Sequence, residues 1–318
     1  MFDNHGRNIE YLRISVTQNC NLKCLYCSPG PDCNKKKECN ILTPSDFKNI
    51  AGIMAGLGIN KIRITGGEPL VRTDICDIIR GISEIKGIED ISMTTNGVFL
   101  DEMAADLKNA GLKRLNVSLD SLKKEKFAQI TGVDRLSNVL EGIKKSIDIG
   151  LLPLKINTVL IKGVNDSEID DFMDLTKEMP VDVRFIELMP IGRFGEENRD
   201  KIIYNSDIIK ARPQLIPLIV KEKGAPAQYY RIKDHKGRIG FISPMSHKFC
   251  NCCNRIRLTC DGKIKPCLGS NGEVDLYEVI NDIDKLTQRI KFAILQKPEG
   301  HNFETSFNSD RSMNAIGG

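Results

Sequence analysis

Short strand-like runs alternate with longer helical stretches from Leu12 to about Pro190. The predicted strands span residues 12–17, 61–65, 91–96, 114–120, 154–161 and 181–188. Helical stretches fall between them, at residues 44–56, 73–85, 100–110, 136–149 and 166–178. This alternation is typical of parallel βα units. Six such repeats predict an α/β fold built as a partial (βα)6 barrel of the TIM type.

Polar and apolar side chains alternate with a period of two in four of these strands, at residues 12–17, 61–65, 154–160 and 181–185, which places them on opposite faces of a sheet. The polar faces carry the cations Arg13, Arg63, Lys155 and Arg184. If helices cover the apolar faces, these cations point into the barrel, where an unpaired charge costs on the order of several kcal/mol. A polyphosphate substrate would balance them. The alternative is that they pair with internal carboxylates or lie at hydrated strand ends.

The alternation of strands and helices stops after Pro190. A turn at Lys236 and Gly237 separates the runs 229–233 and 238–242, which predicts a hairpin. We therefore expect two domains, a barrel over residues 1–235 and a C-terminal domain over residues 236–318.

Composition limits the class of protein. The chain has 318 residues, 41% of them hydrophobic, which is enough for one large domain and a smaller one. The net charge of +4 is small and the lysines are dispersed, so we expect no nucleic-acid partner. The sequence lacks an apolar run of about 20 residues and an N-terminal signal peptide, which favours a cytoplasmic protein without a membrane partner.

Three cysteines form the group Cys20-x3-Cys24-x2-Cys27, one of the most specific features of the chain. In a reducing compartment, eleven cysteines favour metal ligands over disulfides. A [4Fe–4S] cluster held by three thiolates keeps one iron free for another ligand. The alternative is a zinc knuckle completed by Cys33 or Cys39.

A second group is Cys250-x2-Cys253-x13-Cys267, again with three ligands. The spacing alone leaves open a four-cysteine zinc site that uses Cys252 or Cys260. Cys76 lies within a predicted helix and is interpreted as a small buried hydrophobic residue.

The first cysteine group, with Tyr26 before its last cysteine, resembles the CxxxCxxC signature of the radical S-adenosylmethionine (SAM) superfamily. The run Thr65-Gly66-Gly67-Glu68-Pro69 after the second strand is similar to the GGEP element of that superfamily. The resemblance implies a first [4Fe–4S] cluster on Cys20, Cys24 and Cys27, whose free iron binds SAM. It also implies a set of SAM-binding residues: Tyr26, Gly67, Glu68, Ser118 and Met189.

The C-terminal part, with CxxCNRxR from Cys250 to Arg257 and a third cysteine at Cys267, resembles the MoaA family of GTP 3',8-cyclases in molybdenum cofactor biosynthesis. The resemblance covers nearly the whole chain. It implies a second [4Fe–4S] cluster that binds GTP, and a set of GTP-binding residues: Arg13, Arg63, Thr94, Lys155, Arg255 and Arg257. In the family a tail like Gly317-Gly318 reaches the active site, and Arg257 is a candidate catalytic residue; the alternative for the tail is a frayed end.

The reaction implied by the family is abstraction of H3' from GTP by a 5'-deoxyadenosyl radical, followed by attack of the C3' radical on C8 of guanine. The implied product is (8S)-3',8-cyclo-7,8-dihydroguanosine 5'-triphosphate, which passes to cyclic pyranopterin synthase. A flavodoxin or ferredoxin would donate the electron, the C-terminal domain would close the open side of the barrel, and the protein would be a monomer or homodimer.

Two features differ from the family pattern: Gln18-Asn19 stands in place of Asp-Arg before Cys20, and the loop 28–40 is polar and contains cysteines without an assigned role. The competing hypotheses are a radical SAM peptide-modifying enzyme with an auxiliary cluster, and a non-catalytic electron-transfer or zinc-binding module.

Overall fold

The computed structural model describes residues 1–27, 41–219, 224–303 and 310–317. The expectations for Cys33, Cys39, the loop 28–40 and Gly318 lie outside these residues.

Six parallel strands form the centre of the sheet, as predicted. They are β1 (Tyr11–Ser15), β2 (Lys61–Thr65), β3 (Asp90–Thr95), β4 (Arg114–Ser118), β5 (Leu154–Leu160) and β6 (Val181–Glu187). Each strand pairs in parallel with the next. The predicted ranges agree with the observed ones to within about two residues at either end.

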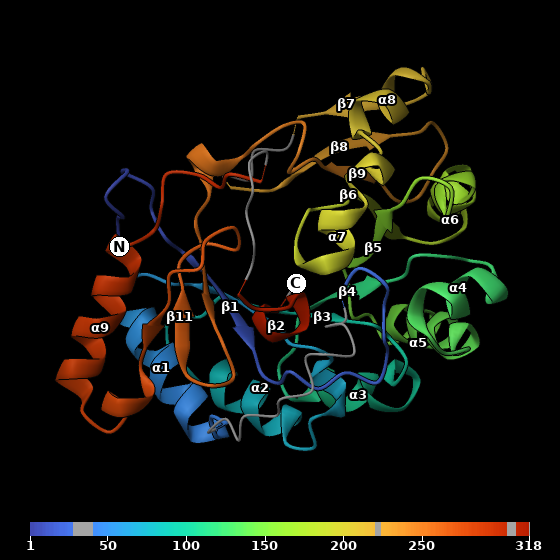
Figure 1. Cartoon of the computed structure of the whole chain (residues 1–318). Coiled ribbons are helices and arrows are strands. Elements are labelled where there is room, and N and C mark those ends of the chain that lie inside the picture. Colours follow the sequence, from blue (N-terminus) through green and yellow to red (C-terminus); the bar gives the residue numbers. More distant parts are fainter. Residues whose placement is uncertain (28–40, 220–223, 304–309, 318) are drawn as a thin grey trace.

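The helices that connect these strands lie around the outside of the curved sheet (Figure 1). They are α1 (Pro44–Gly56), α2 (Ile75–Ser83), α3 (Leu100–Asn109), α4 (Lys124–Thr131), α5 (Leu136–Asp148) and α6 (Ile169–Glu178). Helix α1 begins as expected, with a capping box between Thr43 and Asp46 and Pro44 in the first turn. The predicted helix 166–178 begins with a 3-10 turn, Asp166–Glu168, and α4 was not predicted.

The C-terminal part of the chain extends this sheet at both edges. On one side, β9 (Ile239–Ile242) pairs in parallel with β6, and β8 (Ala227–Arg231) and β7 (Ile216–Leu218) follow it. On the other side, β10 (Arg255–Leu258) pairs in parallel with β1, followed by β11 (Lys263–Lys265) and β12 (Val274–Asp275). The predicted hairpin is confirmed as the antiparallel pair β8–β9. The domain boundary near residue 235 falls in the turn of this hairpin and stays a prediction.

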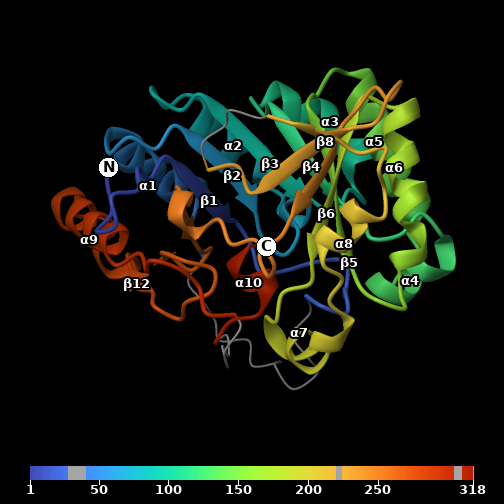
Figure 2. The same ribbon diagram turned by 90° about the horizontal axis from the view of Figure 1, so that it is seen from above.

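The remaining helices are α7 (Gly192–Glu197), α8 (Asn205–Lys210), α9 (Ile283–Leu295) and α10 (Met313–Ile316). Helix α10 lies within the arc of the sheet in both views (Figures 1 and 2). The N-terminal end of the chain lies beside α9, where the Asn4 side-chain amide donates to the Leu295 carbonyl over 2.9 Å. None of the helices in the described ranges is long and apolar enough to cross a membrane.

The core lies between the strands and the outer helices. Leu12, Ile14, Ile62 and Ile64 on β1 and β2 are fully buried there, as the alternation predicts. Burying each such side chain contributes about 1.5–3 kcal/mol. The opposite, polar face of the same strands therefore lines the inside of the partial barrel.

Candidate active site

The first cysteine loop leaves the carboxyl end of β1 and packs against the glycines that follow β2. The amide of Gly67 donates to the Thr17 carbonyl over 2.7 Å, and the amide of Glu68 donates to the Asn19 carbonyl over 2.8 Å. A Cβ on Gly67 would lie only 2.3 Å from the Asn19 oxygen. The absence of a side chain at Gly67 therefore lets two backbone segments approach each other closely.

The other side of this loop is anchored to the last turn of α4. The amide of Lys23 donates to Thr131 over 2.8 Å, and the amide of Leu25 donates to Ile130 over 2.9 Å. The loop is thus fixed from both sides, which limits the positions that its three thiols can take.

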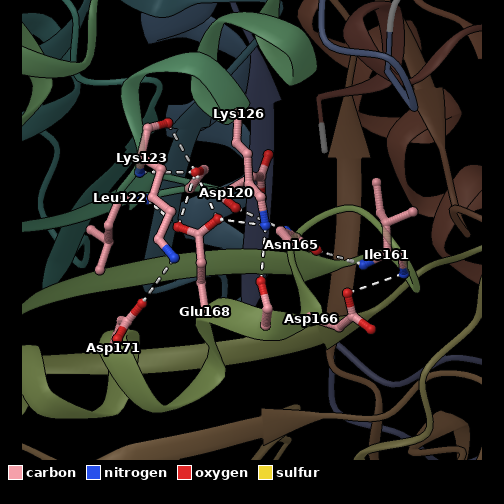
Figure 3. A network of polar contacts seen from close by, with 12 residues as sticks. Asp120, Leu122, Lys123, Lys126, Ile161, Asn165, Asp166, Glu168 and Asp171 are labelled. Carbon is pink, nitrogen blue, oxygen red and sulfur yellow. Dashed lines mark hydrogen bonds and ion pairs between the residues drawn. The ribbon is translucent and has the colours of Figure 1, made fainter.

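Tyr26 is held from behind by a buried network. Its hydroxyl donates to Asp120 Oδ2 over 2.6 Å, and Asp120 Oδ1 accepts from the Val159 amide over 2.8 Å. Burial raises the pKa of Asp120 to about 6. Figure 3 shows the continuation, in which the Asn165 side-chain amide donates to the Asp120 carbonyl and Glu168 accepts from the Leu122 amide. The sequence analysis did not identify this network, because its members come from separate loops and from β5.

Glu68 is buried at the end of β2. Its carboxylate accepts from Thr95 Oγ1 and from the Asn96 amide, both over 2.6 Å. Burial raises the pKa of Glu68 to about 7, against the opposing effect of these hydrogen bonds.

The second cysteine group reaches the same cavity from the other part of the chain. Cys250 lies in the 3-10 turn Cys250–Cys252, Cys253 follows it, and Cys267 comes just after β11. One cavity is lined by all six predicted ligands: Cys20, Cys24, Cys27, Cys250, Cys253 and Cys267. The two groups are therefore brought together although they lie more than 200 residues apart.

The two cysteine groups differ in their electrostatic surroundings. Burial, together with Cys20 and Asp120, raises the pKa of Cys27 to about 12. Although burial opposes it, the positive charges of Arg255 and Lys297 lower the pKa of Cys253 to about 6. The thiolate form, which binds iron, is thus favoured at Cys253.

The four-cysteine zinc alternative at the second group gains no support from the geometry, whereas the zinc knuckle with Cys33 or Cys39 involves residues outside the described ranges. Within the described ranges, no three or more His, Cys, Asp and Glu side chains converge as ligands of one metal ion. Neither Cys252 nor Cys260 lines the cavity. A four-iron cluster takes one thiolate per iron, so the three cavity-lining thiols of each group can bind three of its four irons. Cys76, interpreted as buried, is only partly buried, on α2.

A row of arginines crosses the inner face of the sheet between the cysteine groups. Arg257 on β10, Arg13 on β1 and Arg63 on β2 are direct neighbours in the strand register. Burial, Arg257 and Arg63 together bring the pKa of Arg13 well below its usual value. Burial and Arg255 lower the pKa of Arg257 to about 10. Since like charges at facing positions repel, this row favours a bound polyanion.

The other predicted GTP residues lie around this row. Thr94 and Arg255 line the cavity, and the Arg255 guanidinium lies over the Phe249 ring, 4.8 Å from its centroid. Lys155 is outside the lining; its Nζ lies 5.6 Å from the centroid of the Tyr229 ring. Arg184 lines the cavity, and its Nε donates to Asn157 Oδ1 over 2.8 Å.

The residues predicted to bind SAM are collected on the cavity wall. The lining includes Tyr26, Gly67, Glu68, Ser118 and Met189. Sequence analysis missed other lining residues, such as Phe249, Lys297 and His301. These three follow no motif, and only the folding of the C-terminal part brings them here.

The C-terminal tail packs into the site. The Gly317 carbonyl accepts a hydrogen bond from Arg257 Nη1, and Asn314 Nδ2 donates to the Gln18 carbonyl over 3.0 Å. Gly317 has a φ of +78°, and a Cβ there would lie 2.1 Å from Thr65 Oγ1. The tail therefore contacts both the first cysteine loop and the arginine row.

Comparisons with known proteins cover nearly the full chain. The model of the radical SAM superfamily matches residues 14–176, and that of the Molybdenum Cofactor Synthesis C family matches residues 181–303. A relative from Alkaliphilus oremlandii named GTP 3',8-cyclase is 48% identical over 321 residues, and one from Clostridium botulinum (strain Langeland) with the same name is 48% identical over 320 residues. In both cases the match spans 100% of each chain.

Solved structures with this fold share little sequence with the chain. Streptococcus suis SuiB bound to S-adenosylmethionine has a TM-score of 0.62 at 17% identity, over 93% of this chain and 73% of that one. Native anSMEcpe with bound AdoMet has a TM-score of 0.56 at 15% identity, over 96% of this chain and 93% of that one. At such identities the likeness concerns the fold, and it confirms the predicted partial barrel.

Proposed function

Because the chain belongs to the GTP 3',8-cyclase family of radical SAM enzymes, we propose that it converts GTP to (8S)-3',8-cyclo-7,8-dihydroguanosine 5'-triphosphate. This reaction is the first step of molybdenum cofactor biosynthesis. The observation that carries the proposal is the arginine row Arg257–Arg13–Arg63 lying between two groups of three cysteines in one cavity.

The cysteines fit two [4Fe–4S] clusters. Each group offers three thiols to the cavity, so each cluster keeps one iron for a non-protein ligand. Cys20, Cys24 and Cys27 would hold the cluster that, when reduced, supplies the electron for cleavage of SAM to a 5'-deoxyadenosyl radical. Cys250, Cys253 and Cys267 would hold the cluster at the GTP end.

The protein's own groups bind and orient the two small molecules. Tyr26, fixed by Asp120, and the segment Gly67-Glu68 would contact SAM, together with Ser118 and Met189. The buried cations Arg13, Arg63 and Arg257 would bind the polyphosphate oxygens, assisted by Thr94, Lys155 and Arg255. A triphosphate offers several negative charges, so its binding removes the repulsion within the arginine row.

The tail has a role in this proposal. Gly317 accepts a hydrogen bond from Arg257 in the arginine row, so the tail would contact the substrate at this point, and Gly318 lies outside the described residues. Enclosing the cavity in this way excludes water and oxygen from radical chemistry.

Three further points belong to the proposal. A flavodoxin or ferredoxin would donate the electron, cyclic pyranopterin synthase would take the product, and the chain would act as a monomer or homodimer in the cytoplasm. The peptide-modifying alternative is not favoured, because the full-length relatives at 48% identity are named as cyclases.

The proposal is tested by incubating anaerobic, dithionite-reduced protein with SAM and GTP. We expect 5'-deoxyadenosine and a cyclised nucleotide, and about eight irons per chain. Cys24→Ser should abolish both products, whereas Cys76→Ser, outside the cavity, should retain them. Turnover of a peptide without turnover of GTP contradicts the proposal.

A further inference from the structure

Two buried cations lie next to the second cysteine group, and the proposed function assigns no role to either of them. Arg7, in the N-terminal segment, is 7% exposed, and Lys297, just after α9, is 3% exposed. Burying a cation is costly unless it is balanced or hydrogen-bonded, so the partners of these two residues indicate what they do.

Arg7 joins the N-terminal segment to the loop that carries Cys250. Its Nη1 donates to the carbonyls of Cys250 over 3.0 Å and of Glu299 over 2.7 Å, and its Nη2 donates to Pro298 over 2.6 Å. Its Nε donates to Asp3 Oδ2 over 2.7 Å. Despite burial, hydrogen bonds from Arg7 and His5 lower the pKa of Asp3, so the ion pair is charged on both sides.

Lys297 joins the segments that carry the other two cysteines. Its Nζ donates to the carbonyl of Arg255, two residues after Cys253, over 2.7 Å. It also donates to the carbonyl of Pro266, directly before Cys267, over 2.9 Å. Among the residues that the structure describes, no carboxylate lies within ion-pair distance of Lys297. Its positive charge therefore lies beside the segments that carry Cys253 and Cys267.

Together the two cations hold a backbone carbonyl in each of the three ligand segments. The two cations differ in how their charge is balanced. Asp3 neutralises the charge of Arg7, whereas Lys297 places its positive charge beside the Cys253 thiolate. A cluster on three thiolates gains negative charge when it is reduced, and a nearby cation in a low-dielectric interior stabilises that reduced form.

We propose that Arg7 and Lys297 are positioning residues of the second cluster. Arg7 fixes the Cys250 loop. Lys297 fixes the Cys253 and Cys267 segments, and its charge raises the reduction potential of the cluster. The inference rests on the proposed function, since it takes the second cysteine group to hold a [4Fe–4S] cluster.

The charge effect is measured in a background with Cys20, Cys24 and Cys27 all changed to Ala, in which the second cluster is the one under observation. After anaerobic reconstitution, its midpoint potential is obtained by redox titration followed by electron paramagnetic resonance. Lys297→Met should shift the potential to a more negative value, while Lys297→Arg should leave it at that of the unsubstituted background. An unchanged potential in Lys297→Met, or equal shifts in both variants, overturns the charge effect. If Lys297→Met does not fold, Lys297→Gln takes its place under the same criteria.

The positioning effect is measured as iron per chain in the otherwise unaltered protein. Arg7→Gln should lose at least half of the iron of the second cluster and keep the SAM-dependent spectral change of the first, and Arg7→Lys should restore part of the loss. Arg114→Gln is the matched control, because it breaks a half-buried ion pair with Asp90 at the start of β4. Full iron in Arg7→Gln, or equal loss in Arg114→Gln, overturns this role.

The two proposals fail in different ways. If the unaltered protein cyclises GTP but the Arg7 and Lys297 variants behave like it, only the positioning roles are wrong. If the unaltered protein binds no second cluster, the proposed function is wrong as well.

Discussion

At the scale of single residues, Glu68 and Asp120 are buried carboxylates beside the first cysteine loop that accept hydrogen bonds from neutral donors. Burying a carboxylate costs free energy. We therefore infer that each of these two groups fixes the position of neighbouring residues. Asp120 fixes Tyr26, and Glu68 fixes the turn between β3 and α3 through Thr95 and Asn96. Two predictions follow from this arrangement.

Tyr26→Phe should lower the free energy of unfolding of the cluster-free protein by about 1–3 kcal/mol, because Asp120 loses a hydrogen bond to a buried carboxylate. Urea unfolding measures the change. Tyr204→Phe is the matched control, since Tyr204 is 45% exposed and should change stability by less than about 0.5 kcal/mol. Equal effects of the two variants would show that the Asp120 contact contributes nothing.

Glu68 should make the cluster-free protein less stable as the pH rises from about 4.5 to 7. Its pKa is raised from 4.5 to about 7, so in this window the folded state holds a proton that the unfolded state has released. The stability is therefore greatest at the acid end and falls by up to about 3 kcal/mol across the window. Unfolding measured at several pH values should show a shallower fall in Glu68→Gln. If the free energy of unfolding falls equally with pH in both proteins, the pH dependence does not come from Glu68.

At the scale of elements, the arginine row is a property of three adjacent strands. Facing arginines on β10, β1 and β2 repel one another, and a bound polyanion would relieve this repulsion.

Arg13→Met should weaken GTP binding by at least about tenfold, because it removes the central cation of the arginine row. Calorimetric titration with GTP measures the change. Arg80→Met, at an exposed ion pair on α2, serves as control and should bind GTP as tightly as the unsubstituted protein. Equal affinities of the Arg13→Met variant and the unsubstituted protein would contradict a contact between Arg13 and GTP.

Much of the element pattern could be predicted from the sequence. The six central strands were found because short strand-like runs alternate with longer helical stretches, and in β1 and β2 the apolar positions such as Leu12 and Ile62 are buried as predicted. Helix α4 was missed because it has eight residues, no side-chain cap and few apolar positions. The six cysteines and the inner cations were found from local spacing. The pairing of β10 with β1, and hence the alignment of Arg257 with Arg13, joins residues about 240 positions apart, and no local pattern encodes it.

At the scale of the whole molecule, the cavity collects residues from both edges of the sheet, from the outer loops and from the tail. A ligand that binds this cavity should hold all of these parts together, and so stabilise the fold as a whole.

GTP at about 100 times its Kd should raise the free energy of unfolding by about 2.7 kcal/mol. Guanosine at the same concentration should raise it much less, because it lacks the phosphates that balance the arginine row. Thermal shift measurements at low and high salt test this, and high salt should reduce the advantage of GTP. If GTP and guanosine stabilise the protein equally, the phosphates of GTP do not bind in the cavity.

The pairing of β1 with β10 also bears on how the protein is made. While a ribosome is still synthesising the barrel, the outer edge of β1 exposes unpaired amide and carbonyl groups, and it stays so until residues 255–258 have emerged. The exposed edges of unfinished chains can pair with one another and aggregate. The yield of folded protein therefore depends on how soon β10 is synthesised, or on a chaperone that covers the β1 edge until then.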